Sequence, residues 1–347
     1  MTTGGDEGQH GRDVTRPPTM RDVADHLGVS RQLVSLVMRN APGPSDESRR
    51  RILAAARELG YRPNASARLL RQHRTRLLGT MFTMRNPFQV RFVEQLAARA
   101  AEQGYGLTLG PITADEATDD VVAQLMEERV EAVVAFNPGP DSASLAEAGE
   151  RVPVVWLGEW VEGRPVDNVH VDEVEGLRLA VEHLTGLGHR DIAYVGETGT
   201  RLGRHRAAAY RAAMAGAGLA DHAEVVPGGF GEEDGATAAR EIVARTERPT
   251  AVVCCGDQCA AGVLAVLARS GVAVPGEISV VGFDDSYLAS LSYHRLTSVH
   301  QDVGATVEAA LSTALARIGG DDGPPRTVAT PTTLVVRDST GPAPAGR

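Results

Sequence analysis

The feature that most constrains this chain is a pair of short helical patterns within residues 19–39, separated by a single glycine, Gly28. The first pattern begins at Thr19, a capping residue type, and Asp22 follows three residues later as in a capping box. Apolar residues then recur at helical spacing and predict one buried stripe, formed by Met20, Val23, Ala24 and Leu27. Two short helices joined by a glycine-containing turn, with Val29 plugging the angle between them, make a helix-turn-helix.

The second helix of this motif is predicted to begin after Ser30, another capping residue. Its inward positions are Val34, Val37 and Met38, and its outward positions are Arg31, Gln32, Ser35 and Arg39. In helix-turn-helix proteins the second helix enters the major groove of DNA with its N-terminus first. Arginine pairs there with guanine and glutamine with adenine, so Arg31 and Gln32 are predicted to read base edges. The alternative is that both residues only cover the exposed face of a small helical bundle.

Charge is distributed unevenly along the chain. Residues 1–76 hold 14 arginines against 8 acidic residues, a net charge of +6. The remaining 271 residues hold 21 arginines against 37 acidic residues, a net charge of −16. A basic first segment on an acidic chain is what attraction to DNA phosphates at one end requires, so the charge pattern favours DNA reading.

Two further helices are predicted before the acidic part of the chain. One starts at Ser45 and ends near Gly60, and its inward residues are predicted to be Ile52, Leu53, Ala56 and Leu59. In the other, Asn64 caps a helix of about two turns, a length that is marginal for an isolated helix in water. Arg68 and Arg71 beside two leucines suit a segment that folds against the minor groove of DNA.

Residues 77–340 alternate apolar, β-rich runs with helical stretches, which predicts parallel sheets with helices on both faces. Strands are expected at residues 77–81, 106–109, 132–135, 152–157, 192–195, 251–254 and 278–282, and helices at 90–103 and 176–187. Ligands of open α/β sheets bind beyond the carboxyl ends of the strands. The loops that follow these strands are therefore the expected place for a small-molecule site.

Several other classes of protein are disfavoured. Residues 1–18 are polar and lack the apolar run of a signal peptide, so we expect a disordered tail and a cytoplasmic protein without a membrane span. Cys254, Cys255 and Cys259 lack the spacing of a zinc site and are interpreted as small buried residues, with a redox or metal role as the minor alternative. Walker, nucleophile-elbow and His-Glu-x-x-His motifs are missing, so we expect no enzyme activity, no catalytic residues, no cofactor and no metal.

Residues 19–71 resemble the head and hinge helix of the lac-repressor family of bacterial transcription regulators. Four later stretches resemble the core of that family in the same order, namely residues 77–88, 181–193, 278–285 and 296–301. The resemblance implies an α-helical helix-turn-helix DNA-binding head plus an α/β core of two subdomains, of the type I periplasmic-binding-protein-like kind. It divides the chain into a tail (1–18), a head (19–63), a hinge helix and linker (64–76), an effector-binding and dimerisation core (77–340) and a second tail (341–347).

The resemblance also implies which residues bind. In the core, one subdomain would span about 77–170 and 299–328, and the other about 171–296 and 329–340. The expected DNA-binding residues are Thr19, Ser30, Arg31, Gln32, Ser35, Leu36, Arg39, Asn64, Arg68 and Leu70, with Leu70 as the minor-groove wedge. The expected effector-binding residues are Phe88, Gln89, Arg206, Phe230, Asp257 and Asp284. Among these, Arg206 would bond effector hydroxyls or a carboxylate, and Asp284 would accept hydrogen bonds from the ligand.

Three departures from the family pattern prevent the transfer of a ligand or an operator from a known relative. Gln89 stands where many members have an aromatic residue, and Gly256 replaces a polar residue before Asp257. Leu36 stands where members usually have arginine, so it would contact either a thymine methyl group or no base.

The function implied is a regulator, a repressor by default, that binds a palindromic operator as a homodimer under the control of a sugar-like small molecule in the core cleft. The alternatives are control by a partner protein or a corepressor, or action as an activator. A transporter's solute-binding protein is a more distant alternative, because it needs export and has no DNA-binding head. Residues 340–347 have no apolar heptads, so we expect a dimer without a coiled-coil tetramer.

Overall fold

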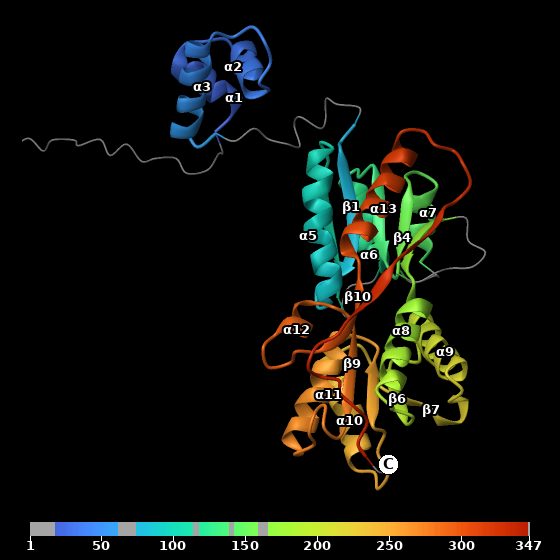
Figure 1. The fold of residues 1–347 in the computed structure, drawn as a ribbon. Coiled ribbons are helices and arrows are strands. Elements are labelled where there is room, and N and C mark those ends of the chain that lie inside the picture. Colours follow the sequence, from blue (N-terminus) through green and yellow to red (C-terminus); the bar gives the residue numbers. More distant parts are fainter. Residues whose placement is uncertain (1–17, 62–73, 114–117, 139–141, 159–165, 346–347) are drawn as a thin grey trace, which may run out of the picture. The chain divides into compact units, whose positions relative to one another are not determined.

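The computed structural model describes residues 18–61, 74–113, 118–138, 142–158 and 166–345 (Figure 1). These residues form two compact units that divide between Arg74 and Thr75, and each unit is described by itself. Most of the predicted N-terminal tail and the whole predicted hinge helix, with Asn64, Arg68 and Leu70, lie outside the described residues.

The first unit contains three helices, α1 (Met20–Leu27), α2 (Arg31–Met38) and α3 (Asp46–Glu58). The predicted capping box of α1 is present, since the Thr19 backbone N–H donates to Asp22 Oδ2 at 2.6 Å and the Asp22 N–H donates to Thr19 Oγ1 at 3.4 Å. Gly28 ends α1 in the left-handed conformation with φ 64°, and the Leu33 N–H donates to Ser30 Oγ at 3.1 Å. The helix-turn-helix prediction is thereby confirmed.

One prediction in α3 was wrong. Leu53 is 39% exposed, whereas Ala55 is buried together with Ile52 and Ala56. Ile52, Ala55, Ala56 and Leu59 follow the i, i+3, i+4, i+7 spacing of a single helix face, and Leu53 lies one residue outside it. The buried residues of α3 meet Val23, Val34 and Val37 of the first two helices in one small core.

The second unit has two six-stranded sheets, and the first has the strand order β11-β5-β4-β3-β1-β2 with every pair parallel. Its strands are β1 (Leu77–Thr83), β2 (Gly106–Ile112), β3 (Ala132–Phe136), β4 (Val154–Leu157), β5 (Asp167–Val171) and β11 (Thr327–Thr330). Its helices are α5 (Pro87–Glu102), α6 (Thr118–Glu127), α7 (Ala143–Gly149) and α13 (Val303–Ile318). Helices α5 and α13 supply one of its two buried cores, and α6 and α7 supply the other, so the prediction of helices on both faces is confirmed.

The second sheet has the order β12-β10-β9-β8-β6-β7, in which only β12 is antiparallel to its neighbour. Its strands are β6 (Ile192–Gly196), β7 (Ala223–Pro227), β8 (Ala251–Cys254), β9 (Ser279–Asp284), β10 (Thr297–Gln301) and β12 (Thr332–Val335). Its helices are α8 (Glu173–Gly186), α9 (Arg201–Gly216), α10 (Glu232–Val243), α11 (Asp257–Arg269) and α12 (Tyr287–Ser290), with a short 3-10 turn, η1 (Ala220–His222). Strands predicted in both sheets are found at the expected places.

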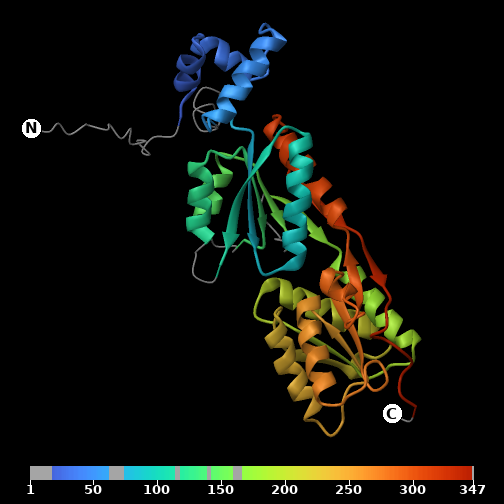
Figure 2. The same ribbon diagram turned by 90° about the vertical axis from the view of Figure 1, so that its left-hand side faces the viewer.

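The chain passes between the two sheets three times (Figure 2). It crosses after Val171, after Gln301 and again between Thr330 and Thr332. The last two crossings lie slightly later in the chain than the bounds implied by the resemblance. Strand β10 therefore belongs wholly to the second sheet, and β11 belongs to the first.

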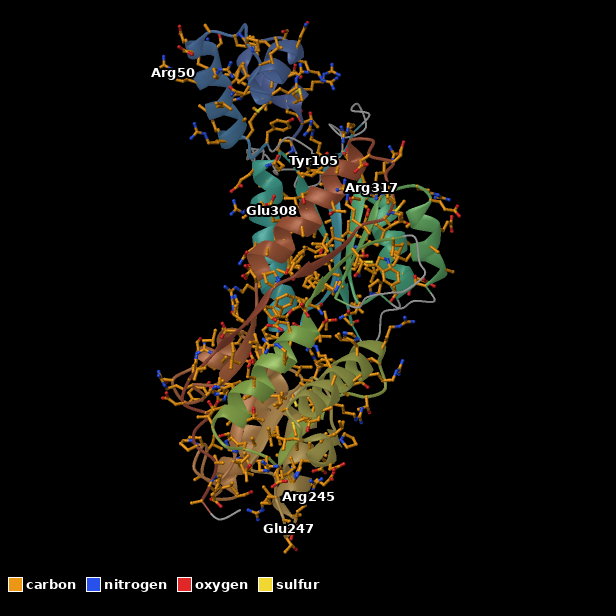
Figure 3. The ribbon with its side chains drawn as sticks, turned by 45° about the vertical axis from the view of Figure 1, so that its right-hand side comes forward. Arg50, Tyr105, Arg245, Glu247, Glu308 and Arg317 are labelled. Carbon is orange, nitrogen blue, oxygen red and sulfur yellow. The ribbon has the colours of Figure 1, made fainter. Side chains whose placement is uncertain are left out.

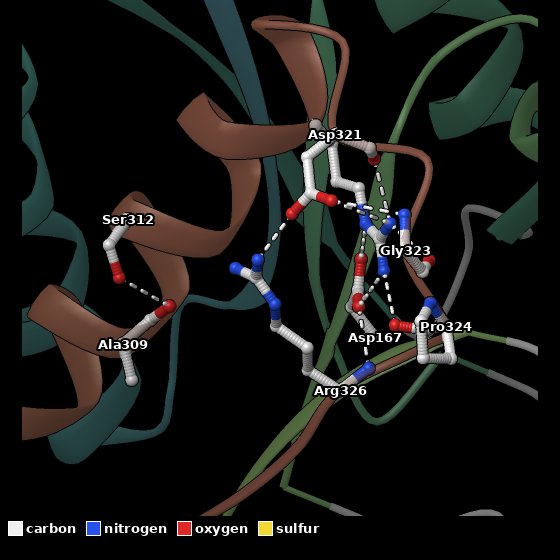
Figure 4. A network of polar contacts seen from close by, with 8 residues as sticks. Asp167, Ala309, Ser312, Asp321, Gly323, Pro324 and Arg326 are labelled. Atoms are coloured by element: carbon white, nitrogen blue, oxygen red, sulfur yellow. Dashed lines mark hydrogen bonds and ion pairs between the residues drawn. The ribbon is translucent and has the colours of Figure 1, made fainter.

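An ion-pair network fixes the loop between α13 and β11 to the start of β5 (Figure 4). The Arg317 guanidinium donates to both carboxylate oxygens of Asp167, at 2.8 and 2.9 Å, and to the carbonyl oxygens of Asp321, Gly323 and Pro324. The Arg326 N–H donates to the same carboxylate at 2.8 Å. This network holds β11 in register at the edge of the first sheet.

The segment after β12 is also fixed to the second sheet. Buried Ser339 accepts the Thr297 N–H at 2.8 Å and donates to the Val280 carbonyl at 2.6 Å. Gly341 donates to Ser279 Oγ at 3.1 Å, and Ala343 donates to the Leu187 carbonyl at 2.9 Å. Residues 341–345, assigned from the sequence to a tail, thus lie against the core. Among the described residues, no helix is both long enough and apolar enough to cross a membrane.

Candidate DNA-reading face and effector pocket

The first turn of α2 presents the predicted base-reading residues. Arg31 and Gln32 are exposed there, and Arg39 is exposed at the other end of the helix, while Ser35 and Leu36 are half-buried. Thr19 and Ser30 are engaged as helix caps, so their hydroxyls hold the two helices in place. The exposed N-terminal turn of α2 therefore offers an arginine, a glutamine and the positive end of a helix dipole on one face.

In the second unit, a cavity of about 50 Å³ lies where the carboxyl ends of strands from both sheets converge. Five of the six predicted effector residues line it, namely Phe88, Gln89, Arg206, Phe230 and Asp284. Its other lining residues are Asn86, Phe136, Asn137, Gly158, Val169, His170, Val171, Glu173, Leu202, Gln301 and Thr306. Sequence reasoning missed these residues, although Phe136, Asn137 and Gly158 come at or just after predicted strands, where a site was expected.

Among the residues that line this cavity, Arg206 is the one that is always positively charged, and it is almost fully buried. It lies in the second turn of α9, its Nη1 donates to the Cys255 carbonyl at 2.5 Å, and its guanidinium carbon is 4.1 Å from the centroid of the Phe283 ring. Its Nη2 is 3.8 Å from Glu173 Oε1. The buried Nε has no hydrogen-bond partner within the described structure. Because a buried donor without a partner costs free energy, this atom favours an acceptor from outside the protein.

Two carboxyl groups in the cavity wall hold protons more tightly than usual. Burial raises the pKa of Glu173 to about 7, although Arg206 acts in the opposite direction. Burial likewise raises the pKa of Asp284 to about 8, against the opposing effect of Arg206 and a hydrogen bond from Gln301 Nε2. The cavity thus holds one fixed cation and two carboxyls that are readily protonated at neutral pH.

Asp257 does not line this cavity, contrary to its predicted contact with the ligand. It is buried, its Oδ1 accepts the Ser298 hydroxyl and its Oδ2 accepts the Ser286 N–H, both at 2.6 Å. Burial raises its pKa to about 6. Because both oxygens are engaged, Asp257 holds the loop that follows β9 rather than facing the cavity.

Gln89 lines the cavity but is partly committed to the protein. Its Oε1 accepts the Thr83 N–H at 2.7 Å, and its own N–H donates to Asn86 Oδ1 at 3.1 Å as part of the α5 cap. Its side-chain amide nitrogen is the group that remains for a ligand, whereas an aromatic residue at this position would present a ring face.

A larger cavity, of about 460 Å³, adjoins the first and shares Phe88 and Asp284 with it. It is lined by the turn before α5, by the first half of α5 and by Ser286 and Tyr287. Met84 and Tyr287 are 63% and 65% exposed at its edge.

The cysteines are buried, and among the described residues no three His, Cys, Asp or Glu side chains are grouped to hold a metal. A helix-turn-helix unit, followed by an α/β core of two largely parallel sheets with a polar cavity at their strand ends, indicates the class of DNA-binding proteins with a small-molecule-binding core. The comparisons with known proteins give this class a family.

The model of bacterial regulatory proteins of the lacI family matches residues 19–64, and that of a periplasmic binding protein-like domain matches residues 181–340. The HTH-type transcriptional repressor PurR of Erwinia tasmaniensis is 32% identical over 94% of this chain and 98% of its own length. The HTH-type transcriptional regulator GalR of Escherichia coli is 34% identical over 86% of this chain and 89% of its own length. The chain belongs to the lacI family and is a DNA-binding transcriptional regulator.

Solved structures agree with this assignment. A LacI transcriptional regulator from a Rhodococcus species is 40% identical with a TM-score of 0.73, and the match covers 77% of this chain and 99% of that one. The lac repressor dimer bound to operator and the anti-inducer ONPF is 28% identical with a TM-score of 0.79, covering 94% of this chain and 100% of that one. The predicted fold class, a helix-turn-helix head with a periplasmic-binding-like core, is confirmed, and the family consists of regulators rather than enzymes.

Proposed function

We propose that this chain is a repressor that binds a palindromic operator as a homodimer in the cytoplasm and is released by a neutral, hydroxyl-rich small molecule bound between its two sheets. Named relatives support the proposal: two are repressors, PurR and the lac repressor, and the regulator CelR, 28% identical, was solved as a cellobiose complex.

The observation that carries the ligand proposal is the buried, unpartnered Nε of Arg206 in a cavity that also contains Asp284. A hydroxyl group both accepts and donates, so a polyol can accept from Arg206 and donate to Asp284. Glu173 Oε1 already lies 3.8 Å from Arg206 Nη2, so the ligand does not have to supply the anion, and a neutral polyol is enough to satisfy the site. The cavity is smaller than the roughly 300 Å³ of typical ligand sites, so binding requires the two sheets to separate or rotate.

On the DNA side, we propose that Arg31 and Gln32 contact base edges and that Arg39 contacts phosphates. Half-buried Leu36 replaces a polar contact with an apolar one, which suits a thymine methyl group. The proposed contacts of Asn64, Arg68 and Leu70 with the minor groove concern residues outside those that the structure describes.

A dimer also accounts for apolar surface on the core. Met84 and Tyr287 are exposed at the edge of the larger cavity, and Tyr293, in the loop after α12, is 77% exposed. Large exposed apolar side chains that gather at one place mark an interaction surface, and we propose that a second copy of the chain covers Met84 and Tyr287.

The first experiment is selection of bound sequences from a random DNA library by the purified protein at stated salt. Enrichment of a palindrome is expected, and enrichment of single half-sites alone would contradict the dimeric operator. The selected palindrome then serves as the probe in a screen of neutral mono- and disaccharides for release.

The ligand site is tested with Arg206→Ala against Arg211→Ala, which removes an exposed arginine of the same helix. We expect Arg206→Ala to bind the palindrome normally and to lose the sugar response by at least about 100-fold in concentration, because a charge-assisted bond is removed. Arg211→Ala should respond like the wild type. A normal response of Arg206→Ala would show that the effector binds elsewhere.

A further inference from the structure

The core begins with two residues, Thr75 and Arg76, that lead into β1, the strand between β2 and β3 in the first sheet. Arg76 has φ 52°, in the left-handed region that residues with a side chain rarely adopt. Such a conformation persists where the surroundings over-determine it, and it is typical of functional positions. The contacts around Arg76 therefore indicate what fixes it.

Two strand starts hold Arg76 on either side. The Arg76 N–H donates to Glu131 Oε1 at 2.8 Å, and Glu131 immediately precedes β3. The Arg76 carbonyl accepts the Gly106 N–H at 2.8 Å, and its guanidinium carbon is 5.5 Å from the ring centroid of Tyr105, which immediately precedes β2. The Tyr105 hydroxyl donates to Glu131 Oε2 at 3.3 Å and closes the arrangement. We name these three residues, Arg76, Tyr105 and Glu131, the strand-start clamp.

The residue before the clamp is tied down as well. Thr75 Oγ1 donates to the Arg129 carbonyl at 2.6 Å, and the Glu131 N–H donates to the Leu77 carbonyl at 2.7 Å. Figure 3 labels the buried Tyr105 near Arg317, at the same end of the core. These contacts hold the backbone in a fixed conformation from Thr75 onward, where the chain enters the core.

The clamp and the effector cavity lie at opposite ends of the same strands. Strand β1 follows Arg76 and ends at Thr83, whose N–H is bonded to the cavity residue Gln89. Strand β3 follows Glu131 and ends at the cavity residue Phe136, with Asn137 next in the chain. The two strands are paired in parallel and span roughly 20 Å, so displacement of the cavity end is carried to the clamp as movement of a rigid element.

We propose that Glu131 and Tyr105 are positioning residues that hold the backbone where the chain enters β1, so that movement at the effector cavity reaches the segment that leads to the head. The inference rests on the proposed dimeric operator reader, because only a protein with two heads needs their separation set. In such a protein, a loosened clamp would weaken the choice of half-site spacing while each head still reads its own half-site.

The experiment measures the affinity of the full-length protein for the selected palindrome, for duplexes with one base pair added or removed at its centre, and for a single half-site. Glu131→Ala removes both acceptors, Glu131→Gln restores one, and Tyr105→Phe keeps the ring but removes the hydroxyl. Glu128→Ala, at an exposed position just after α6, is the matched control. Thermal unfolding of each variant reports whether the core is intact.

For the wild type and Glu128→Ala, we expect altered spacing to weaken binding at least about tenfold. Glu131→Ala should reduce this discrimination by about tenfold, Glu131→Gln and Tyr105→Phe by less, and half-site affinity should not change. Wild-type spacing discrimination in folded Glu131→Ala and Tyr105→Phe would overturn the clamp. If the wild-type protein binds the palindrome but tolerates every spacing, the proposed role of the strand-start clamp is overturned, while the proposed function stands. Failure to bind any palindrome would instead overturn the proposed function.

Discussion

At the scale of single residues, the end of β9 combines an unusual backbone conformation with an ionisable side chain, that of Asp284. Asp284 and Asp285 both have positive φ, 108° and 46°, which is unusual for two consecutive residues other than glycine. The Asp285 carboxylate accepts from Arg337 at 2.7 Å and pairs with His300 Nδ1 at 2.9 Å. With Asp257 bonded to Ser286 next in the chain, these contacts hold the Asp284 carboxylate in the wall of the cavity.

The raised pKa of Asp284 predicts a particular dependence of stability on pH. The folded protein retains a proton up to about pH 8 that the unfolded chain releases near its usual pKa of 3.8. The folded state then binds more protons than the unfolded state between these values, so the free energy of unfolding falls as pH rises through this window. Between pH 5 and pH 8, we expect the free energy of unfolding of Asp284→Asn to fall by roughly 3–4 kcal/mol less than that of the wild type, measured by urea unfolding.

The control for this prediction is Asp221→Asn, at an exposed position in η1, whose stability should follow the wild type across the same range. Glu173 and Asp257 remain in every variant and interact with Asp284, so the difference between variant and wild type reports Asp284 together with its effect on these two carboxyls. Parallel curves for Asp284→Asn and the wild type would contradict the raised pKa.

The sequence alone could predict part of this site. Phe88, Gln89, Arg206, Phe230 and Asp284 were placed by resemblance, and they do come together. Asp257 was misplaced because pairing of β9 with β10 brings Ser298 to it, a contact between residues 41 positions apart. Glu173 was missed because acidic residues are common in the first turn of a helix, where they interact favourably with the helix dipole, and so it did not stand out as a site residue.

At the scale of elements, the Asp167–Arg317 pair joins the loop after α13 to β5. Burial acts to raise the pKa of Asp167, but the hydrogen bonds from Arg317 and from the Arg326 N–H outweigh it and hold the pKa below its usual value. Stability from this carboxylate is therefore present at neutral pH and is lost as the pH falls below about 4.

Replacing Asp167 tests how much this ion pair contributes to stability. Asp167→Asn removes the bidentate anion of the partly buried Arg317 guanidinium and leaves only Asp321 at 4.0 Å, so we expect the core to lose roughly 2–3 kcal/mol at pH 7 by chemical unfolding. Asp322→Asn, at an exposed position in the same loop, should change stability by less than about 0.5 kcal/mol. Equal stability of the two variants would show that the pair adds nothing to the attachment of β11.

Strands buried on both faces were predictable because they are continuous apolar runs, as in β3, β8 and β9. Strands β11 and β12 gave no such signal, since both lie at sheet edges and are largely exposed or half-exposed. Their pairing with β5 and β10 is non-local, and sequence periodicity carries no information about such partners.

At the scale of the whole molecule, the exposed side chains of Met84 and Tyr287 at the edge of the larger cavity make the dimer testable. Tyr287→Glu would place a charge in the proposed interface, where it has no partner. We expect sedimentation to show a monomer at micromolar concentration and palindrome affinity to fall at least about tenfold, because two linked heads bind more tightly than one. Half-site affinity should stay unchanged.

The matched variant is Tyr287→Phe, which preserves the apolar ring and should remain a dimer. A dimeric Tyr287→Glu protein with normal palindrome binding would place the interface on another surface. The two-subdomain plan itself was implied by family resemblance, since the strand and helix periods cannot reveal where a chain leaves one sheet for another.

The three crossings have a consequence for how the protein is made. Each sheet receives an edge strand from the final part of the described chain, β11 for the first and β12 for the second. During translation, therefore, β5 lacks a neighbour until the ribosome has passed Thr330, and β10 lacks one until it has passed Val335, long after residues 19–58 have been synthesised. A message cut short before that point encodes a DNA-reading head on a core with two unpaired sheet edges. Such a product is prone to aggregation and proteolysis, which removes a head that could otherwise bind DNA without control.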